Sequence, residues 1–349
     1  MLACVIRATG DLDRIELLDL PAPPVPLAPG EVRVAVRAAA LNHLDLFVVR
    51  GLSHDIRFPH ILGADGAGVV DAVGKGVTRV KPGDRVMINP GISDYTCEYC
   101  RAGEHSLCVN FRLLGEHLPG TIAESVIVPE QNLGIVPLLD PPLGWAEAAA
   151  FSLVTLTAWR MLVSRAALRA GETVLVWGIG GGVSLAALRI AKLRGARVIA
   201  TSSSDAKLAV ATRLGADVVL NHRTHPVARE VRLQTAGRGA DVVVENVGEG
   251  TWEESLRALA RGGRLVTCGA TGGPKVVTDV RRLFWHQFTI MGSTMGNAAE
   301  YHEVVRQLGE GHLRPIVDRV YPLAQARAAF ERLEKGEQLG KICVEIRSD

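Results

Sequence analysis

The chain has few aromatic residues, no strong excess of either charge and no long uninterrupted hydrophobic run. Aromatic residues make up 5% of the 349 residues and the formal net charge is +2. Since no basic stripe appears either, we expect no nucleic acid partner. The longest apolar stretch, from Val174 to Ile190, is broken by Gly178 and by three glycines at 180–182. It predicts a buried strand followed by a helix, and no membrane span.

We expect no secretory signal peptide, because the N-terminal residues MLACVIR lack its basic and apolar regions. Three of the six cysteines stand apart from one another, and the other three form a cluster typical of a metal site. We therefore expect a reducing, cytoplasmic environment. Hydrophobic residues make up 48% and charged residues 22%, which is ordinary for a globular enzyme and too apolar for disorder. The length allows two domains with separate cores.

The first part of the chain has a pattern of strands and turns. Glu31–Arg37 alternates charged and apolar residues, which predicts a half-buried strand. Further strands are predicted at Val69–Val73 and Arg85–Asn89, with a turn at Lys81–Asp84. Strands separated by glycine and proline turns, without helices between them, indicate a β-rich, barrel-like domain.

From about Glu147 apolar strands alternate with helices, which predicts an α/β domain with a parallel, doubly wound sheet. In the tail, a helix at Leu323–Lys335 precedes a last strand at Lys341–Ile346, which we expect to return to the first domain. The strands predicted for the α/β domain are Thr173–Trp177, Arg197–Thr201, Val218–Leu220, Val242–Glu245, Arg264–Cys268 and Thr289–Met291, with helices at Val183–Arg194 and Lys207–Leu214.

A cysteine cluster between about residues 91 and 111 predicts a structural zinc site. Cys97, Cys100 and Cys108 follow a C-x2-C-x7-C spacing, and Asp94 stands three residues before the first cysteine. A C-x2-C pair can share one tetrahedral zinc ion, and a short loop can supply the third and fourth ligands. We expect Asp94 to complete the set; His105 is the alternative. Three unrelated cysteines or a redox dithiol remain the competing interpretations, although the glycine-rich loop around the pair disfavours a redox role.

A second motif predicts a dinucleotide site. Val174–Gly182 runs from a strand into a turn with four glycines, and a helix follows, so a pyrophosphate can approach the amides at the helix N-terminus. Ser184 replaces the last glycine of the usual fingerprint and should still allow close packing. The next strand ends in hydroxyl residues where an NAD site carries a carboxylate, so NADP(H) is favoured. We expect Asp205 to cap the helix that contains Lys207.

These motifs together resemble the medium-chain dehydrogenase/reductase superfamily over essentially the whole chain. Further anchors of the resemblance are Ala40–Asp45, Pro59–Gly68, Val80–Val86 and Gly340–Cys343. The resemblance implies a GroES-like catalytic domain at residues 1–153 and 296–349 that carries the zinc lobe, a Rossmann dinucleotide-binding domain at 154–295, and an active site in the cleft. We also expect a homodimer or homotetramer.

The chain departs from zinc alcohol dehydrogenases at the positions that bind catalytic zinc. Those positions hold Asn42, Ala64 and Leu153, and alanine and leucine cannot ligate a metal. Asp65 beside Ala64 is the one acidic group that remains there. Several motifs are similar to the quinone oxidoreductase branch, which generally lacks the cysteine lobe. We therefore expect a structural zinc and no catalytic zinc.

The resemblance also implies roles for individual residues. Asn42, Asp45 and Asp65 are the catalytic candidates, with Asn42 as the donor that polarises the substrate carbonyl; structural roles for the two aspartates are an equal alternative. The proton donor is unassigned, and Phe47 stands where a tyrosine is common. The expected cofactor contacts are Gly178, Gly181, Gly182 and Val183 at the pyrophosphate, Ser202, Lys207 and His222 at the adenosine phosphate, and Thr157, Val247, Ala270, Thr271 and Ser293 at the nicotinamide.

The leading hypothesis is an NADP(H)-dependent oxidoreductase that acts on a small apolar ketone, enone or quinone. An alcohol dehydrogenase of apolar secondary alcohols is the second hypothesis. The third, from a different class, is a non-catalytic protein that binds NADPH. Hydride transfer needs orientation from the protein, because the cofactor carries the reactive carbon.

Overall fold

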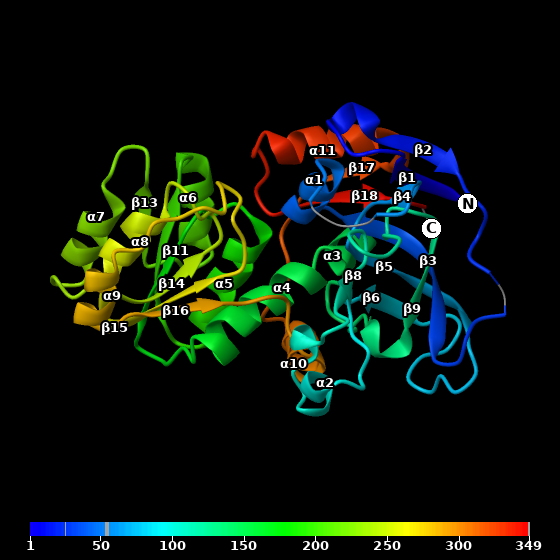
Figure 1. Cartoon of the computed structure of the whole chain (residues 1–349), viewed down its shortest axis with the longest axis horizontal. Helices are drawn as coiled ribbons and strands as arrows, with labels where there is room; N and C mark the ends of the chain where they lie inside the picture. Colours follow the sequence, from blue (N-terminus) through cyan, green and yellow to red (C-terminus); the bar gives the residue numbers. More distant parts are fainter. Residues whose placement is uncertain (25, 53–55, 348–349) are drawn as a thin grey trace. The chain divides into compact units, whose positions relative to one another are not determined.

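The computed structural model describes residues 1–24, 26–52 and 56–347. The chain divides into two compact units (Figure 1): the first contains Met1–Leu153 and Gly296–Asp349, and the second contains Val154–Met295. The first unit is therefore built from both ends of the chain.

The first unit is organised around a sheet of seven strands. Six of them follow the order β10-β6-β5-β3-β18-β17, and β9 also pairs with β3. A smaller sheet has the order β2-β1-β4, and β7 pairs with β8. The strands are β1 (Leu2–Ile6), β2 (Glu16–Asp19), β3 (Glu31–Ala40), β4 (His60–Ile61), β5 (Asp65–Val73), β6 (Arg85–Ile88), β7 (Gly91–Ile92), β8 (Arg112–Leu113), β9 (Ser125–Pro129), β10 (Leu133–Ile135), β17 (Val317–Pro322) and β18 (Lys341–Glu345).

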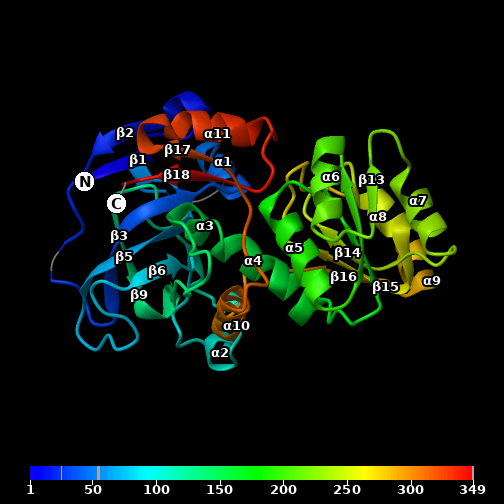
Figure 2. The same cartoon turned by 180° about the vertical axis from the view of Figure 1, so that it is seen from behind.

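Short helices complete this unit: α1 (His43–Val49), α2 (Glu98–Arg101), α3 (Trp145–Ala149), α10 (Ala298–Gly309) and α11 (Ala326–Glu334). Helix α11 buries Ala326, Ala329, Phe330 and Leu333, which recur at helical spacing and join the core of the unit. Figure 2 shows this helix lying along β17 and β18.

The C-terminal strand returns to the first unit, as the sequence predicts. Strand β18 pairs antiparallel with β3, where Cys343 faces Ala40, and parallel with β17. Gly340 makes this entry possible, because its φ is +102° and a Cβ there would lie 2.3 Å from the carbonyl oxygen of Ile316. The first residue of β18, Lys341, is thereby placed beside the end of β3 and the start of β5.

The second unit contains a six-stranded parallel sheet in the order β13-β12-β11-β14-β15-β16. Its central strands are nearly continuous apolar runs, as expected where both faces are covered. The strands are β11 (Thr173–Val176), β12 (Arg197–Ser202), β13 (Val218–Asn221), β14 (Ala240–Glu245), β15 (Leu259–Thr267) and β16 (Thr289–Gly292); the helices are α4 (Ser152–Trp159), which begins in the first unit, α5 (Gly182–Leu193), α6 (Asp205–Arg213), α7 (Val227–Gln234), α8 (Trp252–Ala258) and α9 (Val280–His286).

The predicted doubly wound sheet is confirmed, and the helix start near Lys207 needs one correction. Helix α6 begins at Asp205 with Ser204 as its N-cap residue, so the prediction that Asp205 caps this helix is wrong. The carboxylate of Asp205 instead accepts a hydrogen bond of 2.8 Å from the side-chain amide of Asn221. In the described part of the chain, no helix combines the length and the hydrophobicity needed to span a membrane.

Candidate functional site

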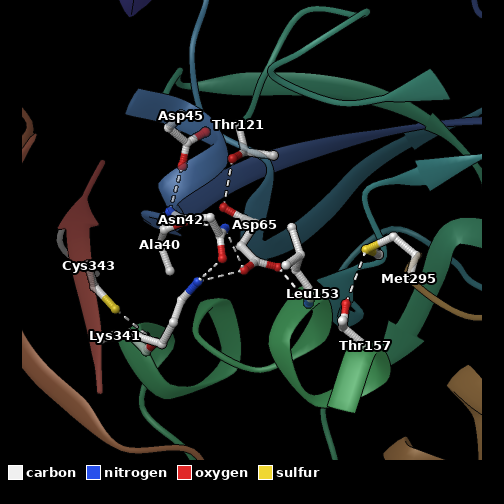
Figure 3. A network of polar contacts seen from close by, with 11 residues as sticks. Ala40, Asn42, Asp45, Asp65, Thr121, Leu153, Thr157, Met295, Lys341 and Cys343 are labelled. Carbon is white, nitrogen blue, oxygen red and sulfur yellow. Dashed lines mark hydrogen bonds and ion pairs between the residues drawn. The ribbon is translucent and has the colours of Figure 1, made fainter. Parts of the chain in front are cut away.

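Three polar side chains form a buried cluster in the first unit (Figure 3). The Lys341 Nζ lies 2.5 Å from Asn42 Oδ1 and 3.0 Å from Asp65 Oδ2. Asn42 Nδ2 donates to the same oxygen of Asp65 over 3.0 Å. The exposed fractions are 8% for Asn42, 3% for Lys341 and 0% for Asp65. A charge pair and an amide therefore share one almost water-free site.

Backbone groups fix the orientation of this cluster. The N–H of Leu153 donates to Asp65 Oδ1 over 2.9 Å, so both carboxylate oxygens of Asp65 are engaged. The hydroxyl of Thr121 donates to the backbone carbonyl of Asp65 over 2.7 Å. Asn42 lies directly before α1, and Asp65 begins β5. The cluster is thus positioned by strand ends and a helix start, which are more rigid than loops.

Asp45 lies one turn into α1 and is fully buried. Its Oδ2 accepts a hydrogen bond of 2.6 Å from the N–H of Asn42. Burial raises the pKa of the Asp45 carboxyl to about 7, a shift that the hydrogen bond from Asn42 and the charge of Lys341 oppose. The protonated form of Asp45 therefore persists to higher pH than that of an exposed aspartate.

The residues at the expected catalytic zinc positions do not form a zinc site. Ala64 is buried and carries no ligand atom, and Leu153 contributes its backbone N–H rather than its side chain. Asp65, the acidic residue that follows Ala64, faces the Lys341 ammonium. A cation that is already bound to the carboxylate opposes the entry of a second one. The donor set therefore does not fit a zinc ion.

Lys341 is the member of this cluster that the sequence analysis does not name. It is part of the Gly340–Cys343 motif but was not assigned a role there. A signal was available, because a lysine that opens the apolar run Ile342–Val344 of a buried strand requires a partner charge.

The predicted zinc lobe brings its four candidate ligands together. Among the described residues, one group of possible metal-ligating side chains has its ligand atoms within 4.8 Å of one another. The group consists of Asp94, Cys97, Cys100 and Cys108. Four donors at this spacing fit one tetrahedral zinc ion with bonds of about 2.0–2.3 Å. The N–H of Thr96 and that of Cys97 donate to Asp94 and hold the pKa of its carboxyl well below the usual range.

The alternative fourth ligand, His105, lies outside this group. Its Nδ1 accepts a hydrogen bond of 3.3 Å from the N–H of Ala298, and its ring lies 4.6 Å from that of Tyr95. Asp94, in contrast, has its second oxygen held by the side-chain amide of Asn110 at 2.8 Å. The geometry therefore favours Asp94 over His105 as the fourth ligand.

The glycine-rich turn of the second unit leaves open space for a phosphate. A Cβ at Gly178 would meet no atom within 4 Å, and one at Gly181 would meet only the Gly178 oxygen at 4.0 Å. Gly182 and Val183 begin α5, so their N–H groups have no partner within the helix. The turn lies where the strand order reverses between β11 and β14, which is where parallel α/β sheets bind ligands. These features fit a dinucleotide.

Ser184 is fully buried and closes this turn, as the sequence predicts for a small residue. Its hydroxyl donates to the carbonyl oxygen of Trp177 over 2.7 Å and accepts from the side-chain amide of Asn246 over 3.0 Å. Ser184 thereby links Trp177, the last residue before the turn, to Asn246, which directly follows β14.

The candidate adenosine-phosphate residues gather beside the same turn. Ser202 ends β12, and the backbone N–H of His222 donates to its carbonyl oxygen over 3.1 Å. The side chain of Lys207 lies over Gly180, where a Cβ would meet its Cδ at 2.8 Å and its Nζ at 3.3 Å. Burial and the neighbouring Arg223 lower the pKa of His222, which favours its neutral imidazole.

The candidate nicotinamide residues follow three adjacent strands. Val247 comes after β14, Ala270 and Thr271 after β15, and Ser293 directly after β16. The carboxyl ends of parallel strands meet at one edge of a sheet, so these residues share that edge. Among the described residues the buried hydroxyl of Ser293 has no hydrogen-bond partner, which leaves it for a bound group. Thr157, in α4, donates to the sulfur of Met295 at 3.7 Å (Figure 3).

Comparisons with known proteins identify the family of this chain. Residues 28–139 match the family model of the alcohol dehydrogenase GroES-like domain, and residues 182–310 match that of zinc-binding dehydrogenases. The chain is 32% identical to an NAD-dependent alcohol dehydrogenase of Sulfolobus acidocaldarius, over 99% of this chain and 100% of the relative. It is also 32% identical to acryloyl-coenzyme A reductase of Metallosphaera sedula, over 90% and 92% of the two chains.

A solved structure shows the same fold. The crystal structure of an NAD-dependent alcohol dehydrogenase is 46% identical and superposes with a TM-score of 0.95, covering 99% of this chain and 100% of that one. The chain therefore belongs to the medium-chain dehydrogenase/reductase superfamily, with a Rossmann unit and a GroES-like unit. It is an oxidoreductase of that superfamily, and its relatives support a nicotinamide cofactor and zinc.

Proposed function

We propose that this protein is an NADP(H)-dependent oxidoreductase that reduces activated acceptors, namely quinones, conjugated enones and apolar ketones, without a catalytic zinc ion. The observation that carries the proposal is the engagement of Asp65 by Lys341, Asn42 and the N–H of Leu153. Without a Lewis acid, unactivated carbonyls lose several kcal/mol of transition-state stabilisation. Activated acceptors need less polarisation, so they should be the better substrates.

The preference for NADP(H) is supported by the end of β12. An NAD site needs a carboxylate there for the ribose 2′-hydroxyl. Ser202 occupies the strand end, and the next carboxylate in the sequence, that of Asp205, is engaged by Asn221. Hydroxyl groups and the Lys207 ammonium suit a 2′-phosphate instead. When bound, NADPH supplies a hydride; Gly181, Gly182 and Val183 would hold its pyrophosphate.

Within the buried cluster we assign three roles. Asn42 can add a secondary hydrogen bond to the substrate oxygen once its weak bond of 3.4 Å to the Ala40 carbonyl is released. Asp65 orients Asn42, and Asp45 can hold or release a proton because its pKa lies near neutrality. The zinc lobe has a structural role only, since four protein ligands leave no position for a substrate.

A second candidate is an alcohol dehydrogenase of apolar secondary alcohols, favoured by the names of the similar alcohol dehydrogenases. The name of the acryloyl-coenzyme A reductase favours the reduction of a conjugated double bond instead. A third candidate, suggested by the missing zinc ligands, is a protein that binds NADPH without catalysis.

Steady-state assays with NADPH and a quinone, a conjugated enone and an aliphatic ketone separate these candidates. We expect turnover of the first two at higher kcat/KM than the third, and no loss of activity with a chelator under conditions that leave the lobe zinc in place. Faster reversible oxidation of a secondary alcohol would support the alcohol dehydrogenase, and NADPH binding without any turnover would support the non-catalytic protein. Asn42→Ala should lower kcat more than it weakens NADPH binding.

A further inference from the structure

We propose that the ammonium group of Lys341 is the electrophile of this site and donates a hydrogen bond to the substrate oxygen, the task that a metal ion performs in a zinc-dependent dehydrogenase. The inference rests on the proposed function and names Lys341 as the residue whose positive charge stabilises the substrate oxygen. It is based on the geometry of Lys341, Asn42 and Asp65 in the first unit (Figure 3).

The Lys341 ammonium has more N–H bonds than hydrogen-bond partners among the described residues. Lysine carries three N–H bonds. Within the described residues, Lys341 Nζ has two oxygen partners, Asn42 Oδ1 at 2.5 Å and Asp65 Oδ2 at 3.0 Å. The third N–H bond is available to a further acceptor, such as a substrate oxygen.

Asn42 is the weaker candidate for this task because both ends of its amide are engaged. Its oxygen accepts from Lys341, and its Nδ2 donates to Asp65 Oδ2 at 3.0 Å and to the Ala40 carbonyl at 3.4 Å. The main role of the Asn42 amide is therefore to position the Lys341 ammonium, since both N–H bonds of the amide already have acceptors. Asn42 and Lys341 keep small exposed fractions of 8% and 3%, whereas Asp65 keeps none. The small accessible surface of the cluster therefore belongs to Asn42 and Lys341 and not to Asp65.

The surroundings make this charge effective. Lys341 is almost fully buried, and a charge in such a site acts more strongly on a developing negative charge than one in water. The partner Asp65 fixes the ammonium before the reaction begins, so little reorganisation is required. A positive charge held in place by a carboxylate thus lies beside Asn42, one of the three residues at the positions where zinc alcohol dehydrogenases bind zinc.

The chemical step balances without a metal. Bound NADPH would supply the hydride, with its two electrons, and would leave as NADP+; the substrate carbon gains the hydride while a π pair moves to the carbonyl oxygen. The N–H of Lys341 stabilises the resulting oxyanion, and a water molecule supplies the proton that completes the reduction, leaving hydroxide to the solvent. Lys341 keeps its own protons throughout and is not consumed.

The test compares Lys341→Met, Lys341→Arg and the control Lys192→Met against a quinone and a conjugated enone. Lys192 is also paired with a carboxylate, that of Asp217 at 2.8 Å, but it belongs to neither the cluster nor the cofactor site. We expect Lys341→Met to lower kcat for the enone by about 100- to 1,000-fold, as for removal of an oxyanion donor. For the quinone, which is already activated, we expect a loss of roughly tenfold or less by the same reasoning.

Lys341→Arg should recover much of the enone activity. The kcat of Lys192→Met should equal that of the wild type, and every variant should keep the wild-type dissociation constant for NADPH. If Lys341→Met does not fold, we replace it with the double variant Lys341→Met/Asp65→Asn. The second substitution removes the carboxylate charge that Lys341 no longer compensates. Equal losses for both acceptors would identify a structural role and overturn the inference, as would an unchanged kcat. A wild type with no turnover of either acceptor would instead overturn the proposed function, on which the inference depends.

Discussion

Lys341 and Asp65 form an ion pair inside the first unit, with Nζ 3.0 Å from Oδ2 and side-chain exposures of 4% and 0%. Removal of one partner from a buried pair leaves an uncompensated charge, which costs about 3–5 kcal/mol. Lys341→Met should therefore lower the free energy of unfolding by this order, and Lys341→Met/Asp65→Leu should recover much of the loss. Urea denaturation measures both. A single variant as stable as the wild type would contradict the pairing.

The zinc lobe makes a second prediction. Cys100→Ser should lower the zinc content and the melting temperature together, because a structural zinc contributes directly to folding. Asp94→Ala should do the same, whereas His105→Ala should keep one zinc ion per subunit. Cys4→Ser, at a buried cysteine outside the lobe, is the matched control for zinc content. Metal analysis of the purified variants decides the matter, and a full zinc load in Asp94→Ala would show that this carboxylate is not a ligand.

Cofactor choice gives a third prediction, measured as dissociation constants for NADPH and NADH. The wild type should bind NADPH more tightly, because each charge-assisted hydrogen bond to a phosphate contributes about 1.5–3 kcal/mol. Lys207→Met should weaken NADPH by roughly tenfold or more and leave NADH unchanged. Ser202→Asp should reverse the preference by placing a carboxylate against the phosphate. Lys192→Met is the control, and equal constants for both cofactors in the wild type would refute the assignment.

A fourth prediction concerns pH and Asp45. Burial raises the folded-state pKa of this carboxyl from 3.8 to about 7, with Asp65 adding to the shift and Lys341 opposing it. Between these values the folded state keeps a proton that the unfolded state releases. This group therefore stabilises the fold most below pH 4, and its contribution declines as the pH rises to 7, by up to about 1.4 kcal/mol per pH unit.

Asp45→Asn removes this titration and keeps an oxygen that can accept from the N–H of Asn42. The difference in unfolding free energy between the variant and the wild type should therefore grow in favour of the variant from pH 4 to pH 7 and then stay constant. Denaturant titrations at several pH values measure it. A difference that does not depend on pH would show that Asp45 is ionised throughout this range.

The fold was largely predictable because its signals are local. The strand–turn–helix motif at Gly178–Ser184 and the alternation in Glu31–Arg37 each follow from nearby residues, and the strands lie within a few residues of the predicted bounds. The cysteine spacing likewise predicted the zinc lobe, in which the structure brings the four candidate ligands together. The start of α6 differs from the prediction because Ser204 and Asp205 are both good capping residues; in the structure Ser204 is the N-cap, and the Asp205 side chain accepts from Asn221.

The buried cluster was less predictable because its members are far apart in sequence. Asn42 and Asp65 were named from motifs, but their partner Lys341 is 276 residues from Asp65. Its proximity depends on β18 pairing with β3, a long-range contact that no local pattern specifies. The charge that satisfies Asp65 could therefore be found only once the last strand was placed.

The central claim, that a lysine and not a metal faces Asp65, is tested most directly by anomalous diffraction at the zinc edge on crystals of the active enzyme soaked in zinc. We predict one strong peak per subunit, between Asp94, Cys97, Cys100 and Cys108, and an ammonium beside Asp65. A second peak beside Asp65, with Lys341 displaced, would contradict the account and restore a catalytic zinc.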